Sequence, residues 1–149
     1  ADRDFLWRIS SAQVELDHSV FTHLPDYHRF LTVLEGELEL QIGSGPKLPL
    51  PPLSICQFDG GVPVESWGRC KDLNLMLRKG ACTGSMEVLR LPAGSSVLPP
   101  DWDILGLYCV QGGTSWLRSG ELGLLQEPTP CRLAPAESSV FLAMKIRLL

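Results

Sequence analysis

The sequence has no long apolar run and no cluster of basic residues. No stretch approaches the roughly 18–20 apolar residues of a transmembrane helix, and no signal-peptide pattern is present. No run of Lys and Arg extends beyond a pair, and the formal net charge is −4. These absences argue against membrane insertion and against nucleic acid or an anionic membrane as a partner. We therefore expect a cytoplasmic, soluble protein.

Cysteine is present, but not in a pattern that binds metal or builds a disulfide framework. The five cysteines are dispersed and none lies in a C-x-x-C motif. An odd, dispersed set argues against a disulfide framework and against a zinc site. We expect small, reduced, buried side chains. No G-x-S-x-G motif or other nucleophile signature occurs either.

Helix-length spans are also scarce, because 14 glycines and 12 prolines are spread through the chain. What remains is a series of short segments with alternating apolar and polar residues, typical of strands. This pattern predicts an all-β protein. The expected strands cover residues 5–16, 18–28, 29–35, 37–42, 54–58, 63–67, 72–77, 86–91, 107–112, 116–118, 122–125, 131–133 and 139–147. A helix is the weaker alternative for 5–16, and the segment 18–28 ends in a turn at 24–26.

The clearest strand signal runs from Arg29 to Ile42 and bends at Gly36. Its segment L-T-V-L-E-G at 31–36 is echoed by L-Y-C-V-Q-G at 107–112. The echo is short, so it is either a chance similarity or the trace of two fused β units. In the second case we expect a first unit at 1–80 and a second at 81–149, packed together as one domain.

Four segments together resemble the HutD/Ves family of double cupins: F-L-W-R-I-S at 5–10, H-R-F-L-T-V-L-E-G at 28–36, F-D-G at 58–60 and D-L-N-L-M at 72–76. The resemblance implies an RmlC-like double-cupin fold, in which two β-sandwich or barrel units of jelly-roll type are fused. It also implies a cytoplasmic role in histidine utilisation, where the protein would sense or buffer N-formylglutamate or urocanate. Family members usually carry a W-K-N-G-G-G-like segment before the W-R-I-S strand, whereas this sequence starts at Ala1. A pocket that needs that segment as a wall would be incomplete.

The metal ligands of typical cupins are not matched. Those cupins use two His, a Glu and a further His around a transition ion. Counting back from Gly36 puts Arg29 at the Glu place, with His23 and Pro25 at the first two His places. The second motif would need a His near Val64, and none is present. A guanidinium beside the ion would repel it, so we expect no metal and no cofactor.

The same arginine suggests a ligand-binding site for a carboxylate. Arg29 presents a planar fork of donors that fits a carboxylate in two hydrogen bonds, if it points into the barrel. Asp72 and Asn74 share one face of their strand and could bind an amide or amine. Arg8 and Ser10 share a face of theirs and add a cation and a hydroxyl. The candidate ligand-binding residues, including one apolar wall, are Arg29, Arg8, Ser10, Asp72, Asn74 and Phe58.

Each assignment has a structural alternative. Arg29 could be a solvated surface arginine. Asp72 and the asparagine two residues on could serve turn chemistry at a strand end. Arg8 could pair with Asp4 or Glu15 at the surface.

Three functions are compatible with these residues. The first is a non-enzymatic protein that binds a small anionic metabolite. The second is a metal-independent cupin enzyme acting on a small organic acid, because one fold hosts many chemistries. The third is an interaction module that forms a homodimer.

Overall fold

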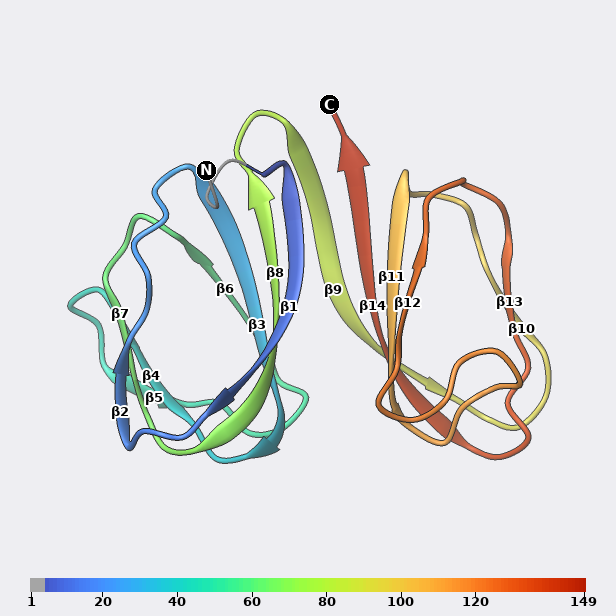
Figure 1. Cartoon of the computed structure of the whole chain (residues 1–149), viewed down its shortest axis with the longest axis horizontal. Helices are drawn as coiled ribbons and strands as arrows, with labels where there is room; N and C mark the ends of the chain where they lie inside the picture. The colour runs from blue at the N-terminus through green and yellow to red at the C-terminus, as the bar shows by residue number, and fades with distance from the viewer. Residues whose placement is uncertain (1–4) are drawn as a thin grey trace. The chain divides into compact units, whose positions relative to one another are not determined.

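The computed structural model describes residues 5–149 as an all-β protein (Figure 1). Fourteen strands and no helix occur in this range, which confirms the expected fold class. The strands are β1 (Trp7–Val14), β2 (His18–Val20), β3 (Tyr27–Gly36), β4 (Glu39–Ile42), β5 (Lys47–Pro49), β6 (Ile55–Asp59), β7 (Val64–Trp67), β8 (Cys70–Arg78), β9 (Cys82–Leu91), β10 (Ser96–Leu98), β11 (Ile104–Gln111), β12 (Leu122–Leu125), β13 (Cys131–Leu133) and β14 (Ser139–Leu148).

The chain divides into two compact units, the first ending at Cys82 and the second spanning Thr83–Leu149. In the first unit, one four-stranded sheet has the order β1-β8-β3-β6 and the other has the order β2-β7-β4-β5. Figure 1 shows these two sheets facing each other across the unit. Apolar side chains from both sheets form one buried cluster between them: Leu31, Val33, Leu38, Leu40, Leu50, Phe58, Val64 and Cys70. The first unit is therefore a β-sandwich with its own core.

The central pair of this unit is β3 and β8, which run antiparallel with a bulge between Val33 and Glu35. β3 ends at Gly36, whose φ is 94°. A Cβ there would collide with the carbonyl oxygen of Arg69 and lie 2.8 Å from the Cα of Cys70. Glycine is required at this corner because both its conformation and its surroundings exclude a side chain.

The second unit repeats this plan. Its main sheet has the order β12-β11-β14-β9, and β10 pairs with β13. β11 and β14 are antiparallel with a bulge between Cys109 and Gln111, and the following Gly112 has a φ of 80°. A Cβ at Gly112 would collide with the Oγ of Ser139, at the start of β14. The echo between 31–36 and 107–112 thus marks the same strand–bulge–glycine corner in two fused units.

One expected strand is wrong, and the one expected over 18–28 is shorter, because β2 ends at Val20 and residues 21–26 lie outside any strand. Residues 116–118 do not form a strand, and only an isolated bridge joins Gly113 to Arg118. The hydroxyl of Thr114 accepts hydrogen bonds from the backbone N–H groups of Trp116 (3.3 Å) and Leu117 (3.0 Å). This local hydrogen bonding replaces a strand ladder. The short strand β10 was not expected, because Pro and Gly residues surround it.

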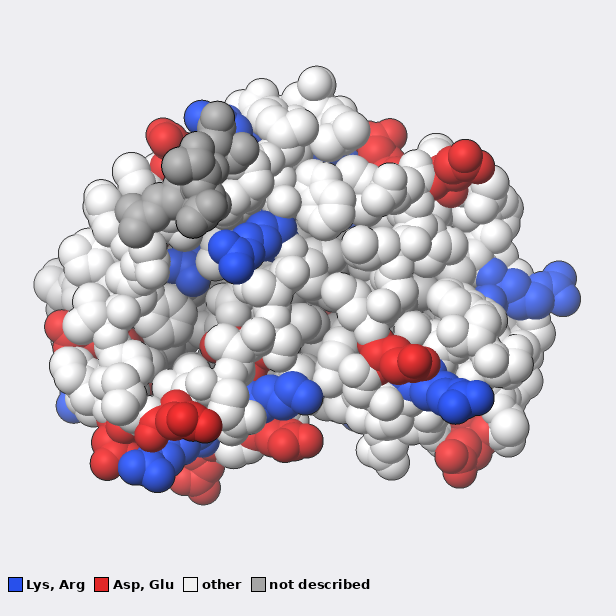
Figure 2. All heavy atoms as spheres, viewed as in Figure 1, with Lys and Arg blue, Asp and Glu red and all other residues white. Residues whose placement is uncertain are grey.

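Charged side chains are distributed without a basic patch on the face drawn in Figure 2, where most Lys and Arg lie beside Asp or Glu. The cysteines are free; Cys56 is half-buried and the other four are buried. Within residues 5–149, no helix is long and apolar enough to cross a membrane.

Candidate functional site

The strand register brings all six candidate residues to one face of the β1-β8-β3-β6 sheet. In antiparallel sheets, directly opposed residues point to the same face. Arg8, Met76, Arg29 and Phe58 form one row across the four strands. A second row places Ser10, Asn74 and Leu31 side by side, and a third places Asp72 opposite Val33. Leu31 and Val33 belong to the buried cluster, so this face lines the interior of the first unit.

Arg29 is the central polar group of this interior. Its side chain is only 5% exposed. One terminal nitrogen, Nη1, donates to the carbonyl oxygen of Thr22 at 3.2 Å. The Nε atom is buried and has no hydrogen-bond partner among the described residues. A buried donor without a partner costs free energy, so this edge of the guanidinium needs an acceptor that the described chain does not supply.

Two aromatic rings lie against the guanidinium group of Arg29. Its Cζ lies 5.3 Å from the ring centroid of Phe21 and 5.2 Å from that of Phe58. The two rings meet edge to face, with centroids 5.9 Å apart. Cation–π contacts of this kind fix the guanidinium in place without satisfying its N–H groups. The planar donor edge therefore keeps its hydrogen-bonding capacity for another group.

Asp72 and Asn74 lie inside β8 and are 4% and 6% exposed. One carboxylate oxygen of Asp72, Oδ1, accepts hydrogen bonds from the backbone N–H of Ala12 and from the Asn74 amide, both at 3.0 Å. Within the described part of the chain, nothing donates to the other oxygen, Oδ2. The pair therefore keeps a free acceptor on the same face as Arg29.

Arg29 and Asp72 influence each other without forming an ion pair within 4 Å. Burial raises the pKa of the Asp72 carboxyl, and the positive charge of Arg29 only partly opposes this shift. Burial likewise lowers the pKa of the Arg29 guanidinium, and Asp72 opposes the change. Because desolvation is the larger cause in both groups, neither charge is fully compensated. The guanidinium nevertheless stays protonated, since its ordinary pKa lies above 12.

The structure decides between the alternatives for these residues. Arg29 is not a surface arginine, and Asp72 does not cap a strand end, because both are buried within long strands. Arg8 is exposed and lies 5.8 Å from the ring centroid of Phe5. No described residue forms an ion pair with it, Glu15 included, while the suggested partner Asp4 lies outside the described residues. Arg8 thus stands at the end of the row, away from the buried groups.

Phe21 and Thr22 were missed by sequence reasoning. Both lie in the expected strand 18–28, but β2 ends at Val20 and the segment that follows is outside any strand, so the expected alternation does not orient them. The backbone N–H of Phe21 bonds to the carbonyl of Val64 at 2.9 Å, and its partly buried ring packs against the core cluster of the first unit. The only signal in the sequence was an aromatic residue close to a turn.

A divalent metal does not fit this site. Within residues 5–149, no group of three or more His, Cys, Asp or Glu side chains could hold a metal ion. By the count back from Gly36, the place of the Glu ligand is expected at Arg29. His18 bonds to Glu65 and His28 to Gln57, each at 3.1 Å. Both imidazoles therefore already have partners elsewhere, and a carboxylate would suit the interior better than a cation.

Solved structures resemble the chain over nearly its whole length. PA5104 from Pseudomonas aeruginosa PAO1, a conserved protein of unknown function, has a TM-score of 0.83 at 24% identity, over 97% of this chain and 84% of that one. HutD from Pseudomonas fluorescens SBW25 has a TM-score of 0.79 at 16% identity, over 99% and 82%. A cupin 2 conserved barrel domain protein from Leptotrichia buccalis has a TM-score of 0.58 at 10% identity, over 95% and 89%. At these identities the likeness establishes the double-cupin fold alone.

Sequence comparison identifies the family. No curated protein is similar to the chain in sequence. The HutD family, however, matches residues 1–144 of the 149. This match confirms the resemblance inferred from the segments at 5–10, 28–36, 58–60 and 72–76, and the protein belongs to the HutD family.

Proposed function

We propose that this protein binds a small carboxylate-bearing metabolite inside its first unit, with Arg29 as the anchor. The observation that carries the proposal is the buried Nε of Arg29, which has no hydrogen-bond partner. The ligand carboxylate would accept from Nε and from the terminal nitrogen Nη2, because Nη1 is already used by Thr22. Side-on pairing of this kind gives two parallel charge-assisted hydrogen bonds.

The electrostatics of the interior support an anion as the ligand. A buried cation with no carboxylate in contact carries a desolvation cost that an incoming anion removes. The opposite charge nearest to Arg29, Asp72, has its own pKa raised by burial and does not contact the guanidinium. The ligand carboxylate would therefore be the one counter-ion in direct contact with the Arg29 guanidinium, since Asp72 forms no ion pair with it.

The neighbouring polar groups set the remaining chemistry of the ligand. Oδ2 of Asp72 can accept a hydrogen bond from an amide or imidazole N–H. Asn74 and Ser10 stand opposite each other in the neighbouring row of the same face. N-formylglutamate offers two carboxylates and an amide N–H, and urocanate offers a carboxylate and an imidazole. Both suit the family's place in histidine utilisation, so we propose a regulatory, cytoplasmic protein that senses or buffers one of them.

Calorimetric titration of the whole protein with N-formylglutamate, urocanate, glutamate and formate tests this proposal. We expect at least one acid to bind, and Arg29→Lys and Arg29→Ala each to weaken that binding at least tenfold, which is about 1.4 kcal/mol. Lys retains the charge but cannot form the paired hydrogen bonds. Arg132→Ala, which removes an exposed arginine of β13, is the matched control and should bind as the parent does. Equal affinity of the Arg29 variants would remove Arg29 from the site.

Mass analysis of the same mixtures distinguishes binding from catalysis. A binding protein returns the acid unchanged after prolonged incubation. Turnover that survives a chelator and is lost in Asp72→Asn would instead identify a metal-independent enzyme. Gel-filtration mass over a dilution series tests the remaining proposed partner, a second copy of the chain.

A further inference from the structure

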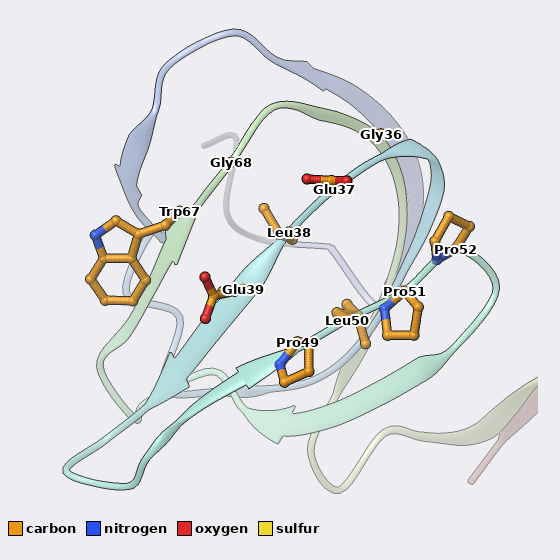
Figure 3. A pocket seen from close by; sticks show the side chains of 10 residues that line it. All are labelled: Gly36, Glu37, Leu38, Glu39, Pro49, Leu50, Pro51, Pro52, Trp67 and Gly68. Atoms are coloured by element: carbon orange, nitrogen blue, oxygen red, sulfur yellow. The ribbon is translucent and has the colours of Figure 1, made fainter.

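A pocket lies in the first unit, and none of the six carboxylate-site residues lines it. Its volume is about 540 Å³, within the range of small-molecule sites. Figure 3 shows it bounded by Trp67 on one side and by a proline-rich segment on the other. The lining residues are Gly36, Glu37, Leu38, Glu39, Pro49, Leu50, Pro51, Pro52, Trp67 and Gly68.

Strand register separates this pocket from the Arg29 interior. Glu39 of β4 stands opposite Trp67 of β7 and Pro49 of β5. The next residue, Leu40, is buried in the core cluster, so it points inward. Since side chains alternate along a strand, the Trp67–Glu39–Pro49 row points outward. The side of the pocket formed by Trp67, Glu39 and Pro49 is therefore on the outer face of the β2-β7-β4-β5 sheet, and the core residues Leu38 and Leu50 complete the lining. The six carboxylate-site residues lie on the inner face of the other sheet.

The floor of the pocket is formed by a close backbone crossing. The N–H of Glu37 bonds to the carbonyl of Arg69 at 3.1 Å. Gly68 has a φ of 114°, and a Cβ there would collide with the carbonyl oxygen of Glu37. The prolines add rigid apolar surface and no N–H donors. The backbone on this side of the pocket is therefore conformationally constrained.

The charge of the lining is entirely negative. Glu37 and Glu39 place two carboxylates between Trp67 and the prolines (Figure 3). No described residue forms an ion pair or hydrogen bond with either carboxylate. The Trp67 ring already has the Lys47 ammonium 3.9 Å and the His18 imidazole 5.3 Å from its centroid, so we assign no cation–π contact between this ring and a ligand. An organic cation would gain from the two carboxylates and from the apolar proline walls.

A bare metal ion fits the pocket poorly. Two carboxylates supply too few oxygen ligands for calcium, and proline rings cannot supplement them. The same apolar walls favour an occupant with a carbon body. We propose that this pocket binds a small organic cation, an amine or guanidinium carried on an apolar body, with Glu37 and Glu39 as its counter-ions.

Three probes of equal size and different charge test the proposal: phenethylamine, 2-phenylethanol and phenylacetate. Each is titrated into the isotope-labelled whole protein, and binding is followed by amide and indole N–H chemical shifts. We expect phenethylamine to shift the signals of Gly36–Glu39 and of the Trp67 indole, with at least tenfold higher affinity than the alcohol. Phenylacetate should not bind there. Added salt should weaken the amine alone, because only its binding depends on charge.

Variants assign the preference to the two carboxylates. The double variant Glu37→Gln/Glu39→Gln should bind phenethylamine no more tightly than 2-phenylethanol. Glu35→Gln, which removes an exposed carboxylate just outside the pocket, should retain the preference. Arg29→Lys should also retain it, which separates this site from the proposed carboxylate site. Equal binding of all three probes, absence of phenethylamine binding, or a preference that survives the double variant would overturn the proposal.

Discussion

At Arg29 the first unit buries a permanent positive charge, and the Nε donor of this residue has no hydrogen-bond partner among the described residues. Such a group lowers the stability of the fold unless a counter-ion enters. Phe21 and Phe58 stabilise the guanidinium in part, at 5.3 and 5.2 Å from their ring centroids. Under the proposed function, a ligand that pairs with this residue should stabilise the protein.

Asp72 gives a pH-dependent prediction at the same scale. Burial raises its pKa in the folded state above its ordinary value of 3.8, so folding favours the protonated carboxyl. Below pH 3.8 the group is protonated in both states and costs nothing; as the pH rises through the folded-state pKa, its ionisation destabilises the fold. Asp72→Asn keeps an Oδ1 acceptor and does not titrate. We expect its free energy of unfolding, relative to the parent, to rise between pH 4 and pH 8, by about 1.4 kcal/mol for each unit of pKa shift.

Urea unfolding at several pH values measures this difference. Glu127→Gln, at an exposed carboxylate, is the control and should show no comparable pH trend. A difference between Asp72→Asn and the parent that is the same at every pH would show that the raised pKa does not act on stability.

Among the elements, the β3–β4 corner depends most on one glycine. Gly36 combines a φ of 94° with backbone atoms of Arg69 and Cys70 where a Cβ would stand. Gly80 has a φ of 78° but nothing within 4 Å of its Cβ position. We expect Gly80→Ala to cost about 1–2 kcal/mol from backbone strain alone. Gly36→Ala should cost a further 1–3 kcal/mol or so, because the adjacent strand must move.

Urea midpoints of the two alanine variants provide the comparison. Gly36→Ala should also disturb the pocket lined by Glu37, because the pocket floor is the same backbone crossing. Equal losses in the two variants would mean that the corner relaxes freely around a side chain.

Strand positions were largely predictable because successive side chains of a strand point to opposite faces of its sheet, so apolar and polar residues alternate along the sequence. β1, β3, β8 and β14 follow apolar–polar or apolar runs, and β3 and β8 are also bounded by glycine or proline. The failure at 116–118 came from the Thr114 hydroxyl, whose hydrogen bonds hold that segment in a turn. Local side-chain bonding of this kind competes with the ladder and leaves no periodic signal.

For the whole molecule, the distribution of cysteines provides a test of both cores at once. Four of the five free thiols are buried, two in each unit: Cys70 and Cys82 in the first, Cys109 and Cys131 in the second. Burial raises the pKa of all four, and that of Cys70 to about 11, with the charge of Asp72 adding to the shift. A thiolate is the reactive form, so these thiols should react slowly.

We expect a thiol reagent at pH 8 to modify the half-buried Cys56 first and to reach the other four only when the protein is unfolded. Peptide mapping after pulse labelling in rising urea would identify each site. Rapid labelling of Cys109 or Cys131 in the native protein would show that the second core opens readily, contrary to its close burial.

The sequence by itself determined the fold class, the strand–glycine corners, and the pairs Arg8/Ser10 and Asp72/Asn74 that each share a face of their own strand. It could do so because side-chain alternation and positive-φ glycines are local consequences of strand geometry. That Arg29 stands at the place of a metal-ligand carboxylate remains a prediction from the count back from Gly36.

Only the tertiary structure decided what surrounds those residues. It buried Arg29 against Phe21, a residue from a segment without periodicity, and left its Nε without an acceptor. It also assembled Glu37, Glu39, Pro51 and Trp67 around one hollow. Both results depend on the pairing of segments far apart in the sequence, such as Arg29 with Met76 and Glu39 with Trp67, and on desolvation that all the surrounding strands create together. No local pattern contains that information, because burial is a property of the packed sheets.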